Sequence, residues 1–347
     1  MQAAAAGRRR RERLGGVFVT VGAALVLAAL LVIPLFLIGS LEPWQPLPSG
    51  AWQRLGVLFA GSLKAAVCAI AVAVPIGLAA AAFTAHFCAP RLRSWIKPAF
   101  EVLEAIPTVV LGLVAGATLA PWLKTHVATV LALIVIVPAA LLAAGLAAGL
   151  WTQRRTGWLP LWLTPFIVAV GVCVIGLAAL HDSTSIAPST PWNGMLIGLA
   201  LGLAAVPLVF SIAEDALLLI PATHTQAALA LGATRWQALT SIVVPAAGSG
   251  LVAAIVLGAS RCLGETMIVL MASGNTPLFD PNPLTGLRAL SAELALGLPE
   301  ASPASAVWRE LLLAALVLFA LTFLLNLLAQ RLRASLHRRA DAQASAA

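Results

Sequence analysis

The stretch that decides how this chain is organised lies between two long apolar runs. Residues 223–245 read THTQAALALGATRWQALTSIVVP. Thr223 and Gln226 have the Thr-x-x-Gln spacing of a capping box, in which two side chains satisfy backbone N–H groups at a helix start. Gly232 is the residue type that most readily adopts the left-handed conformation at a helix end. The pattern predicts one short helix that begins at Thr223 and stops at Gly232.

The second half of the stretch repeats these signals. Thr234 and Gln237 form another capping box directly after the glycine. The helix that they open is expected to end before Pro245, because proline cannot continue a helical hydrogen-bond ladder. Two short helices joined at a glycine and held between apolar runs are suited to take a mechanical load from a partner outside the bilayer.

The rest of the chain is too apolar for a water-soluble protein. Of its 347 residues, 61% are hydrophobic and 10% are charged, and the mean hydropathy is +0.99. A soluble domain has about 45–50% apolar and about 25% charged residues. The formal charge of +8 does not indicate nucleic-acid binding, because the basic residues lie in short clusters between apolar runs. The four cysteines have no CxxC or Cys/His spacing, so neither disulfides nor a metal site are expected.

Eight apolar runs are long enough to cross a bilayer, which takes about 20 helical residues each. They lie at about 17–39, 59–84, 100–122, 127–150, 160–181, 194–218, 246–272 and 308–330. The sequence therefore predicts an all-α polytopic membrane protein of about eight transmembrane helices.

The orientation follows from the basic residues. When the runs alternate from an inner N-terminus, most of the 21 Lys and Arg residues fall on the inner side. Such residues gather in cytoplasmic loops, so both termini and the capped segment are expected in the cytoplasm. Arg8–Arg13 before the first run resemble the start of a secretory signal. That run exceeds the usual signal length of about 7–15 apolar residues, and no small-x-small site follows Ser40, so we expect an uncleaved anchor helix.

The capped segment also matches a known spacing. Gln226-Ala227-Ala228 is followed by Gly232 after three residues, by Ile242 after nine more and then by Pro245. This spacing resembles the EAA loop of ABC importer permeases, and the alternative is an ordinary amphipathic turn between two spans. Gln226 stands where the family usually has Glu. The resemblance implies that the positions coupling the chain to a cytosolic ATPase are Gln226, Ala227, Ala228, Gly232, Ala233 and Pro245.

Three further stretches narrow this resemblance. They are EAIPTVVLG at 104–112, FSIAEDA at 210–216 and RCLGETMIVLMASGNTP at 261–277. They resemble the phosphate-specific (Pst) permeases of the PstC type, and Gly-Glu-Thr-Met followed by Gly-Asn is the most specific match. The resemblance implies a type I ABC importer permease core in the bacterial inner membrane. It also implies a PstA-like second permease subunit, a PstB-like ATPase and a PstS-like periplasmic phosphate-binding protein as partners.

The resemblance also divides the chain. The expected parts are a basic segment, anchor helix and outer loop at 1–58, a permease domain at 59–335 with its coupling loop at 220–245, and a cytoplasmic tail at 336–347. An extra apolar hairpin at about 123–190 departs from the family. Because it adds a pair of runs, the coupling loop stays on the cytoplasmic side. Gly145-x-x-x-Gly149 has the spacing of a helix-packing motif, and the alternative is a chance spacing among 27 glycines.

Two charges inside the seventh run are candidates for substrate recognition. Arg261 and Glu265 are four residues apart, which places them on one face of a helix. Each costs about 2.5–3.5 kcal/mol at the bilayer centre, so we expect a function beyond mutual neutralisation. A guanidinium binds two phosphate oxygens at once. A carboxylate beside it accepts a hydrogen bond only from an anion that still carries a proton, as hydrogen phosphate does near neutral pH and sulfate does not.

The phosphate-permease resemblance implies that this Arg and Glu lie on the translocation path. From the matching stretches we extend the path to Glu104, Thr108 and Asn275. Arg261 is about 22 Å along its helix at about 1.5 Å per residue, whereas Glu104 opens the third run at the cytosolic face. We therefore expect no pairing between them, and Glu104 is either an inner gate or an interfacial charge.

Two other features of the runs receive simpler interpretations. Pro107 is expected to kink the third helix. Glu214 and Asp215 are expected to end the sixth run at the cytosolic interface, with contact to the ATPase as the alternative.

The sequence therefore favours one half of a permease dimer that imports inorganic phosphate. We do not expect an enzyme, because the chain has no GxxxxGK[ST] P-loop. No cofactor is expected in this chain, and ATP and Mg²⁺ are assigned to the partner ATPase. One alternative is a permease for another oxyanion, such as molybdate or sulfate. The other is a secondary transporter or channel, which leaves the capped double-helix loop unexplained.

Overall fold

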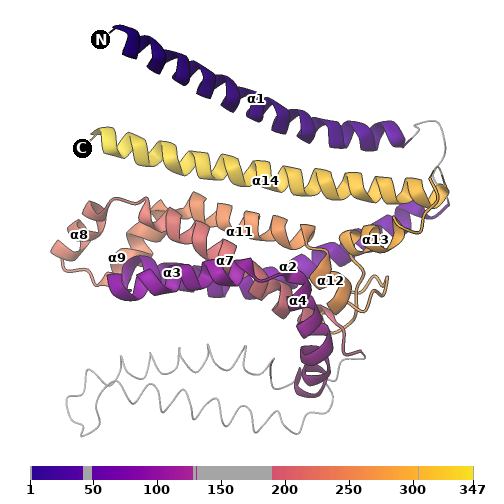
Figure 1. Cartoon of the computed structure of the whole chain (residues 1–347). Coiled ribbons are helices and arrows are strands. Elements are labelled where there is room, and N and C mark those ends of the chain that lie inside the picture. Colours follow the sequence, from indigo (N-terminus) through magenta and orange to yellow (C-terminus); the bar gives the residue numbers. More distant parts are fainter. Residues whose placement is uncertain (1, 42–48, 128–129, 131–189, 304, 347) are drawn as a thin grey trace, which may run out of the picture.

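The computed structural model describes residues 2–41, 49–127, 130, 190–303 and 305–346. Every regular element in these ranges is a helix (Figure 1), as the sequence predicts. Five helices there are long and apolar enough to cross a membrane, or six if one bent pair counts as a single span. The predicted runs at 127–150 and 160–181, with the GxxxG spacing, lie almost wholly outside the described residues. The total of about eight spans therefore stays a prediction.

The centre of the bundle is the contact between α2 (Ala51–His86) and α7 (Gly194–Leu218). Most residues of α7 are buried, and α7 has the bounds of the sixth predicted run. Gly198 and Gly202 lie one turn apart and face α2. A Cβ atom on Gly202 would lie 2.8 Å from the carbonyl oxygen of Ala69. Small residues allow such close backbone packing, which holds helices together where lipid removes the ordinary hydrophobic driving force.

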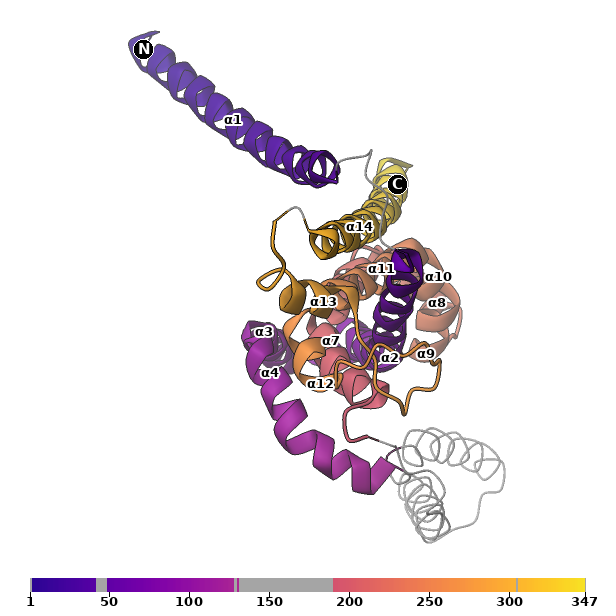
Figure 2. The ribbon, with the colours of Figure 1, turned by 90° about the vertical axis from the view of Figure 1, so that its right-hand side faces the viewer.

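Three further helices complete the bundle. α11 (Gly248–Gly264) packs against both central helices, and α14 (Ala306–Ala346) covers α11. α1 (Gln2–Ser40) contacts α14 and stands apart from the other helices (Figure 2). Both termini and the short helices α8 (Ala222–Ala230) and α9 (Arg235–Ala238) lie at one end of the molecule, which we name the terminal end (Figure 1).

The third predicted run, 100–122, is not one helix. α3 (Pro90–Ala105) is separated from α4 (Thr108–Val114) by Ile106 and Pro107, both extended with ψ 127°. Proline disfavours a helical conformation in the residue before it and has no N–H of its own. The expected kink is therefore a complete interruption, and α3 begins about ten residues earlier than the run.

The seventh predicted run, 246–272, is interrupted twice. A bend of 72° separates the helical stretch Arg235–Ala246 from α11. α11 ends before Glu265 and Thr266, which lead into α12 (Met267–Ala272). A straight span of this length is therefore replaced by helical pieces that are separated by a bend and by the extended residue Glu265.

The helical stretch that the second capping box opens continues past Pro245 to Ala246, so the prediction that it ends before this proline is wrong. The π-helical turn η3 (Leu239–Val243) is followed by α10 (Val244–Ala246), in which Pro245 occupies the first turn. The helical stretch continues through this proline to Ala246, and the bend of 72° follows directly after it. A second π-helical turn, η1 (Ala115–Leu119), follows α4 in the third span.

The end opposite the terminal end is closed by α13 (Leu290–Gly297) and the loop before it. Lys64 on α2 fastens this loop. Its Nζ donates hydrogen bonds to the carbonyl oxygens of Asp280 at 3.0 Å and Thr285 at 3.2 Å. The amine thus satisfies loop carbonyls and fixes the loop to a central helix.

Candidate functional site

Arg261 on α11 makes an ion pair with Glu104 on α3. Nη1 donates a hydrogen bond to Oε1 over 3.1 Å, and the two side chains are 32% and 41% exposed. The prediction that these residues do not pair is wrong. Because α3 begins at Pro90, Glu104 and Arg261 both lie about 20 Å along their helices at about 1.5 Å per residue. The two side chains therefore meet at one level of the bundle.

Glu265 does not share a helical face with Arg261, which corrects a second prediction. α11 ends at Gly264, and Glu265 is extended with φ −71° and ψ 128°. Its carboxylate accepts a hydrogen bond from the Met267 N–H at 3.3 Å, and its carbonyl oxygen accepts one from Ser291 Oγ at 2.9 Å. The hydrogen bonds of Glu265 thus stabilise the break between α11 and α12. The carboxylate in contact with Arg261 is that of Glu104.

Thr108 lies where two interrupted helices come together. It is the first residue of α4, and α4 packs against α12. The interruption after α3 therefore lies beside the interruption after α11, with the Arg261–Glu104 pair close to both. In a membrane, non-helical backbone is tolerated only where protein or a water-filled cavity surrounds it. We take this junction as the candidate site.

Asn275, the remaining residue of the predicted path, is not brought to the pair. It lies beyond α12 in a turn, with a left-handed φ of 49°. Its Nδ2 donates to the Leu270 carbonyl oxygen at 3.0 Å, and its Oδ1 accepts from Ser273 Oγ at 3.2 Å. With these hydrogen bonds the Asn275 side chain closes the end of α12.

The predicted helix stop at Gly232 is confirmed by its φ of +88°. The Ala233 N–H donates to the Ala228 carbonyl oxygen and the Gly232 N–H to that of Leu229, both at 3.0 Å. Together they form a Schellman motif, which satisfies the last carbonyl groups of a helix and favours glycine at its left-handed position. Ala228, Gly232 and Ala233, three of the predicted coupling positions, thus form one helix end.

The two predicted capping boxes differ in outcome. The Gln237 N–H donates to Thr234 Oγ1 at 3.2 Å, and the Thr234 N–H donates to Gln237 Oε1 at 2.8 Å, so the second box is confirmed. The first box, at Thr223 and Gln226, is absent. α8 begins directly after Pro221 and has no side-chain cap. Thr223 is then already inside the first turn, where it cannot cap the helix.

The surface of this loop includes large apolar side chains. Gln226 and Ala227 are exposed, and Leu231 and Trp236 expose 90% and 63% of their surface. The Trp236 ring lies 6.4 Å from that of Phe87, beside the end of α2. Large exposed apolar side chains at the tip of a hairpin are typical of protein contact sites. Neither residue was predicted as a contact, although both lie beside the capping signals in the sequence.

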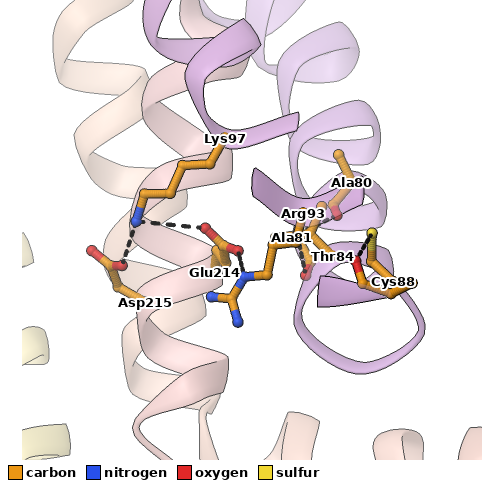
Figure 3. Close-up of polar contacts among 9 residues, drawn as sticks. Ala80, Ala81, Thr84, Cys88, Arg93, Lys97, Glu214 and Asp215 are labelled. Carbon is orange, nitrogen blue, oxygen red and sulfur yellow. Dashed lines mark hydrogen bonds and ion pairs between the residues drawn. The ribbon is translucent and has the colours of Figure 1, made fainter. Parts of the chain in front are cut away.

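A second group of charges lies at the terminal end of α7 (Figure 3). Glu214 is fully buried, and its Oε1 accepts a hydrogen bond from Arg93 Nε at 3.0 Å. Lys97 Nζ lies 3.9 Å from Glu214 Oε2 and 3.9 Å from Asp215 Oδ1. We name Arg93, Lys97, Glu214 and Asp215 the Glu214 cluster.

The positions of Glu214 and Asp215 differ from the prediction that both acidic residues end a span at the interface. α7 continues to Leu218, and Asp215 is 51% exposed whereas Glu214 is 0% exposed. The sequence holds a signal for it, because Arg93 and Lys97 are four residues apart and share a face once a helix starts at Pro90. Only the folded chain shows which carboxylate that face meets.

The candidate site can offer an anion a charged hydrogen-bond donor. Within the described ranges, no group of three or more His, Cys, Asp or Glu side chains could hold a metal ion. Arg261 offers a fixed, permanently charged donor fork. Its ion-pair partner in the described part of the chain is one half-exposed carboxylate, Glu104.

Comparison with known proteins gives a consistent picture. Residues 73–341 match the family described as binding-protein-dependent transport system inner membrane component. The phosphate transport system permease protein PstC 2 of Mycobacterium tuberculosis is 28% identical over 196 residues, which cover 56% of this chain and 48% of that protein. The chain thus spans about half the length of this relative.

Two other relatives match over more of their length. The phosphate transport system permease protein PstC of Mesorhizobium japonicum is 24% identical over 291 residues, covering 83% of this chain and 75% of that protein. The probable ABC transporter permease protein YqgH of Bacillus subtilis is 25% identical over 339 residues, covering 92% and 90%.

Proposed function

The chain belongs to the family of binding-protein-dependent transport system inner membrane components, and we propose that it is the permease subunit of an ATP-driven importer of inorganic phosphate. The observation that carries the proposal is the Arg261–Glu104 pair at the junction of two interrupted helices. The names of the relatives from M. tuberculosis and M. japonicum support phosphate as the substrate.

Arg261 is the proposed anion-binding group. A guanidinium donates two parallel hydrogen bonds to an oxyanion and keeps its charge at any physiological pH. Charged side chains within spans are rare, face the bundle interior and mark ion pathways. The anion would take the position that Glu104 occupies beside Arg261 when no substrate is bound.

Glu104 takes over the selective role that the sequence assigns to Glu265. A carboxylate cannot donate a hydrogen bond when ionised, so it repels an anion unless that anion brings a proton. Hydrogen phosphate donates one to the displaced carboxylate, whereas sulfate and molybdate have none to donate near neutral pH. The pair thus attracts oxyanions through Arg261 and discriminates among them through Glu104.

The loop formed by α8 and α9 is the proposed contact with a cytosolic ATPase, which binds ATP and Mg²⁺. The exposed Leu231 and Trp236 and the ordered helix end at Gly232 support this role. Gln226 would contact the ATPase without the charge that the family usually has there. A second permease subunit and a periplasmic phosphate-binding protein complete the proposed importer, with both termini in the cytoplasm.

Uptake of labelled phosphate tests the proposal. Cells with and without the chain are compared at low external phosphate, with excess sulfate or molybdate as competitors and with ATP depleted. We expect uptake that requires the chain, resists both competitors and stops without ATP. Inhibition by one competitor would replace phosphate by that oxyanion, and uptake driven by an ion gradient without ATP would indicate a secondary transporter.

A further inference from the structure

α3 exposes large apolar side chains on one face and directs several charged side chains toward other helices on another face. Its exposed apolar residues, Leu92, Trp95 and Val102, expose 50%, 79% and 67% of their surface. Arg93 and Lys97 on another face contact α7 instead. Charges directed into a bundle and apolar groups directed outward are typical of a helix in a membrane. The charged face of α3 therefore has partners inside the protein.

These partners lie at both ends of α3. Near its start, Arg93 and Lys97 hold the buried Glu214 of α7 (Figure 3). At its end, Glu104 holds Arg261 of α11. Arg93 and Glu104 are about 16 Å apart along the axis at about 1.5 Å per residue. One helix thus connects the Glu214 cluster to the candidate anion site.

The contact between α3 and α7 is also packed. The rings of Phe100 and Phe210 stack with centroids 4.1 Å apart and an interplanar angle of 18°. An ion pair with a fully buried carboxylate and an aromatic stack one turn away resist separation of the two helices. α3 and the end of α7 are therefore expected to move together.

Glu214, which joins α7 to α3, lies close to α8 along the chain. α7 ends at Leu218, and only Leu219, Ile220 and Pro221 separate it from α8. A displacement of α8 by a partner protein therefore acts directly on the part of α7 that carries Glu214.

We propose that Arg93, Lys97 and Glu214 are positioning residues that make α3 follow α7, so that a displacement of α8 separates Glu104 from Arg261. This inference rests on the proposed function, because it assumes an ATPase at α8. The ion pair at the start of α3 stays closed during transport, and the pair at its end opens and closes. ATP binding by the partner would thereby release Arg261 for the anion.

The distance between two spin labels in the complete importer, measured without phosphate, tests this inference. Spin labels are placed at Val102→Cys on α3 and Val252→Cys on α11, both exposed, after replacement of Cys68, Cys88, Cys173 and Cys262. We expect ATP to change the distance between the labels in the otherwise unaltered protein. In Glu214→Gln we expect less than half of that change.

The matched control is Arg91→Gln, an exposed residue of α3 with no ion pair in the described part of the chain. It should keep the full change in distance. If Glu214→Gln does not assemble, Lys97→Gln replaces it, since Lys97 is 42% exposed and more tolerant of substitution. A full change in the Glu214 or Lys97 variant, or no change in the unaltered protein, would overturn the inference.

Transport by the same complexes separates this inference from the proposed function. We expect Glu214→Gln to lower the phosphate imported per ATP hydrolysed by at least about fivefold, the lower end of ordinary coupling between sites. A normal ratio in this variant counts against the inference. A complex that shows the ATP-dependent distance change but imports no phosphate would refute the substrate and leave the inference standing.

Discussion

The two ends of α3 carry ion pairs of different character. At its start, Arg93 and Lys97 hold Glu214, whose side chain is 0% exposed. At its end, Glu104 and Arg261 are 41% and 32% exposed. Both pairs join α3 to another helix, and both involve one carboxylate that accepts a guanidinium hydrogen bond.

The difference in exposure indicates which ion pair can open. A carboxylate that water does not reach is stabilised only by its cationic partners. Without them, the penalty for an uncompensated buried charge is several kcal/mol. A half-exposed pair has water and other ions as substitutes and is held by a smaller free energy. We therefore expect the first pair to fix the position of α3 and the second to exchange its partners during function.

The largest effect is expected from Arg261→Ala. Hydrogen bonds to charged groups contribute about 1.5–3 kcal/mol each, so the loss of two lowers phosphate uptake by about 100-fold or more. Assembly with the ATPase should remain, as measured by copurification. Arg91→Ala is the control for removal of an arginine. Loss of assembly in Arg261→Ala but not in Arg91→Ala would mean that both ion pairs of α3 are structural. The two pairs would then not differ in role.

A large effect on stability is expected at the other end. Arg93→Ala leaves Glu214 with Lys97 alone at 3.9 Å and should lower the free energy of unfolding by about 3–5 kcal/mol. Glu104→Ala should lower it by less than about 1 kcal/mol, because its pair is partly exposed. Denaturant unfolding of the purified protein in detergent measures both. Equal losses would show that exposure does not distinguish the two pairs.

A smaller change is expected when the second pair loses only its negative charge. Glu104→Gln no longer competes with the anion for Arg261, so we expect about fivefold tighter phosphate binding, within the usual range for one polar contact. Sulfate should then inhibit phosphate uptake, which we do not expect in the unaltered protein. Uptake assays with sulfate competition measure this change, and unaltered selectivity would remove Glu104 from substrate discrimination.

The smallest effect is expected at Asp215, the neighbour of Glu214. Asp215 is 51% exposed and lies 3.9 Å from Lys97, so Asp215→Asn should change the free energy of unfolding by no more than about 0.5 kcal/mol. Glu214→Gln, with the same change of charge one residue away, should have a clearly larger effect. Thermal unfolding of the two variants side by side measures the contrast, and similar shifts would mean that burial of Glu214 is unimportant.

Much of this molecule could be predicted because its signals are local. The bounds of α7 follow from the length of one apolar run. The stop at Gly232 and the capping box at Thr234 and Gln237 follow from hydrogen bonds between residues three to five apart. The absent box at Thr223 shows the limit of such signals, since Pro221 set the start of α8 and excluded it.

The charged contacts could not be predicted in the same way. The spacing of Arg261 and Glu265 suggests a pair on one helix, but α11 stops between them at Gly264. The pairing of Arg261 with Glu104, and that of Arg93 with Glu214, depends on where separate helices begin and at which level they cross the bundle.

By itself, then, the sequence determined the membrane class, most of the helices in the described ranges and the short capped hairpin, because hydropathy and helix ends are properties of neighbouring residues. The tertiary structure alone decided which carboxylate faces each arginine and how much water reaches it. Those two quantities depend on the packing of α3 against α7 and on where α3 meets Arg261 of α11. They distinguish the buried ion pair from the half-exposed pair that we propose binds an anion.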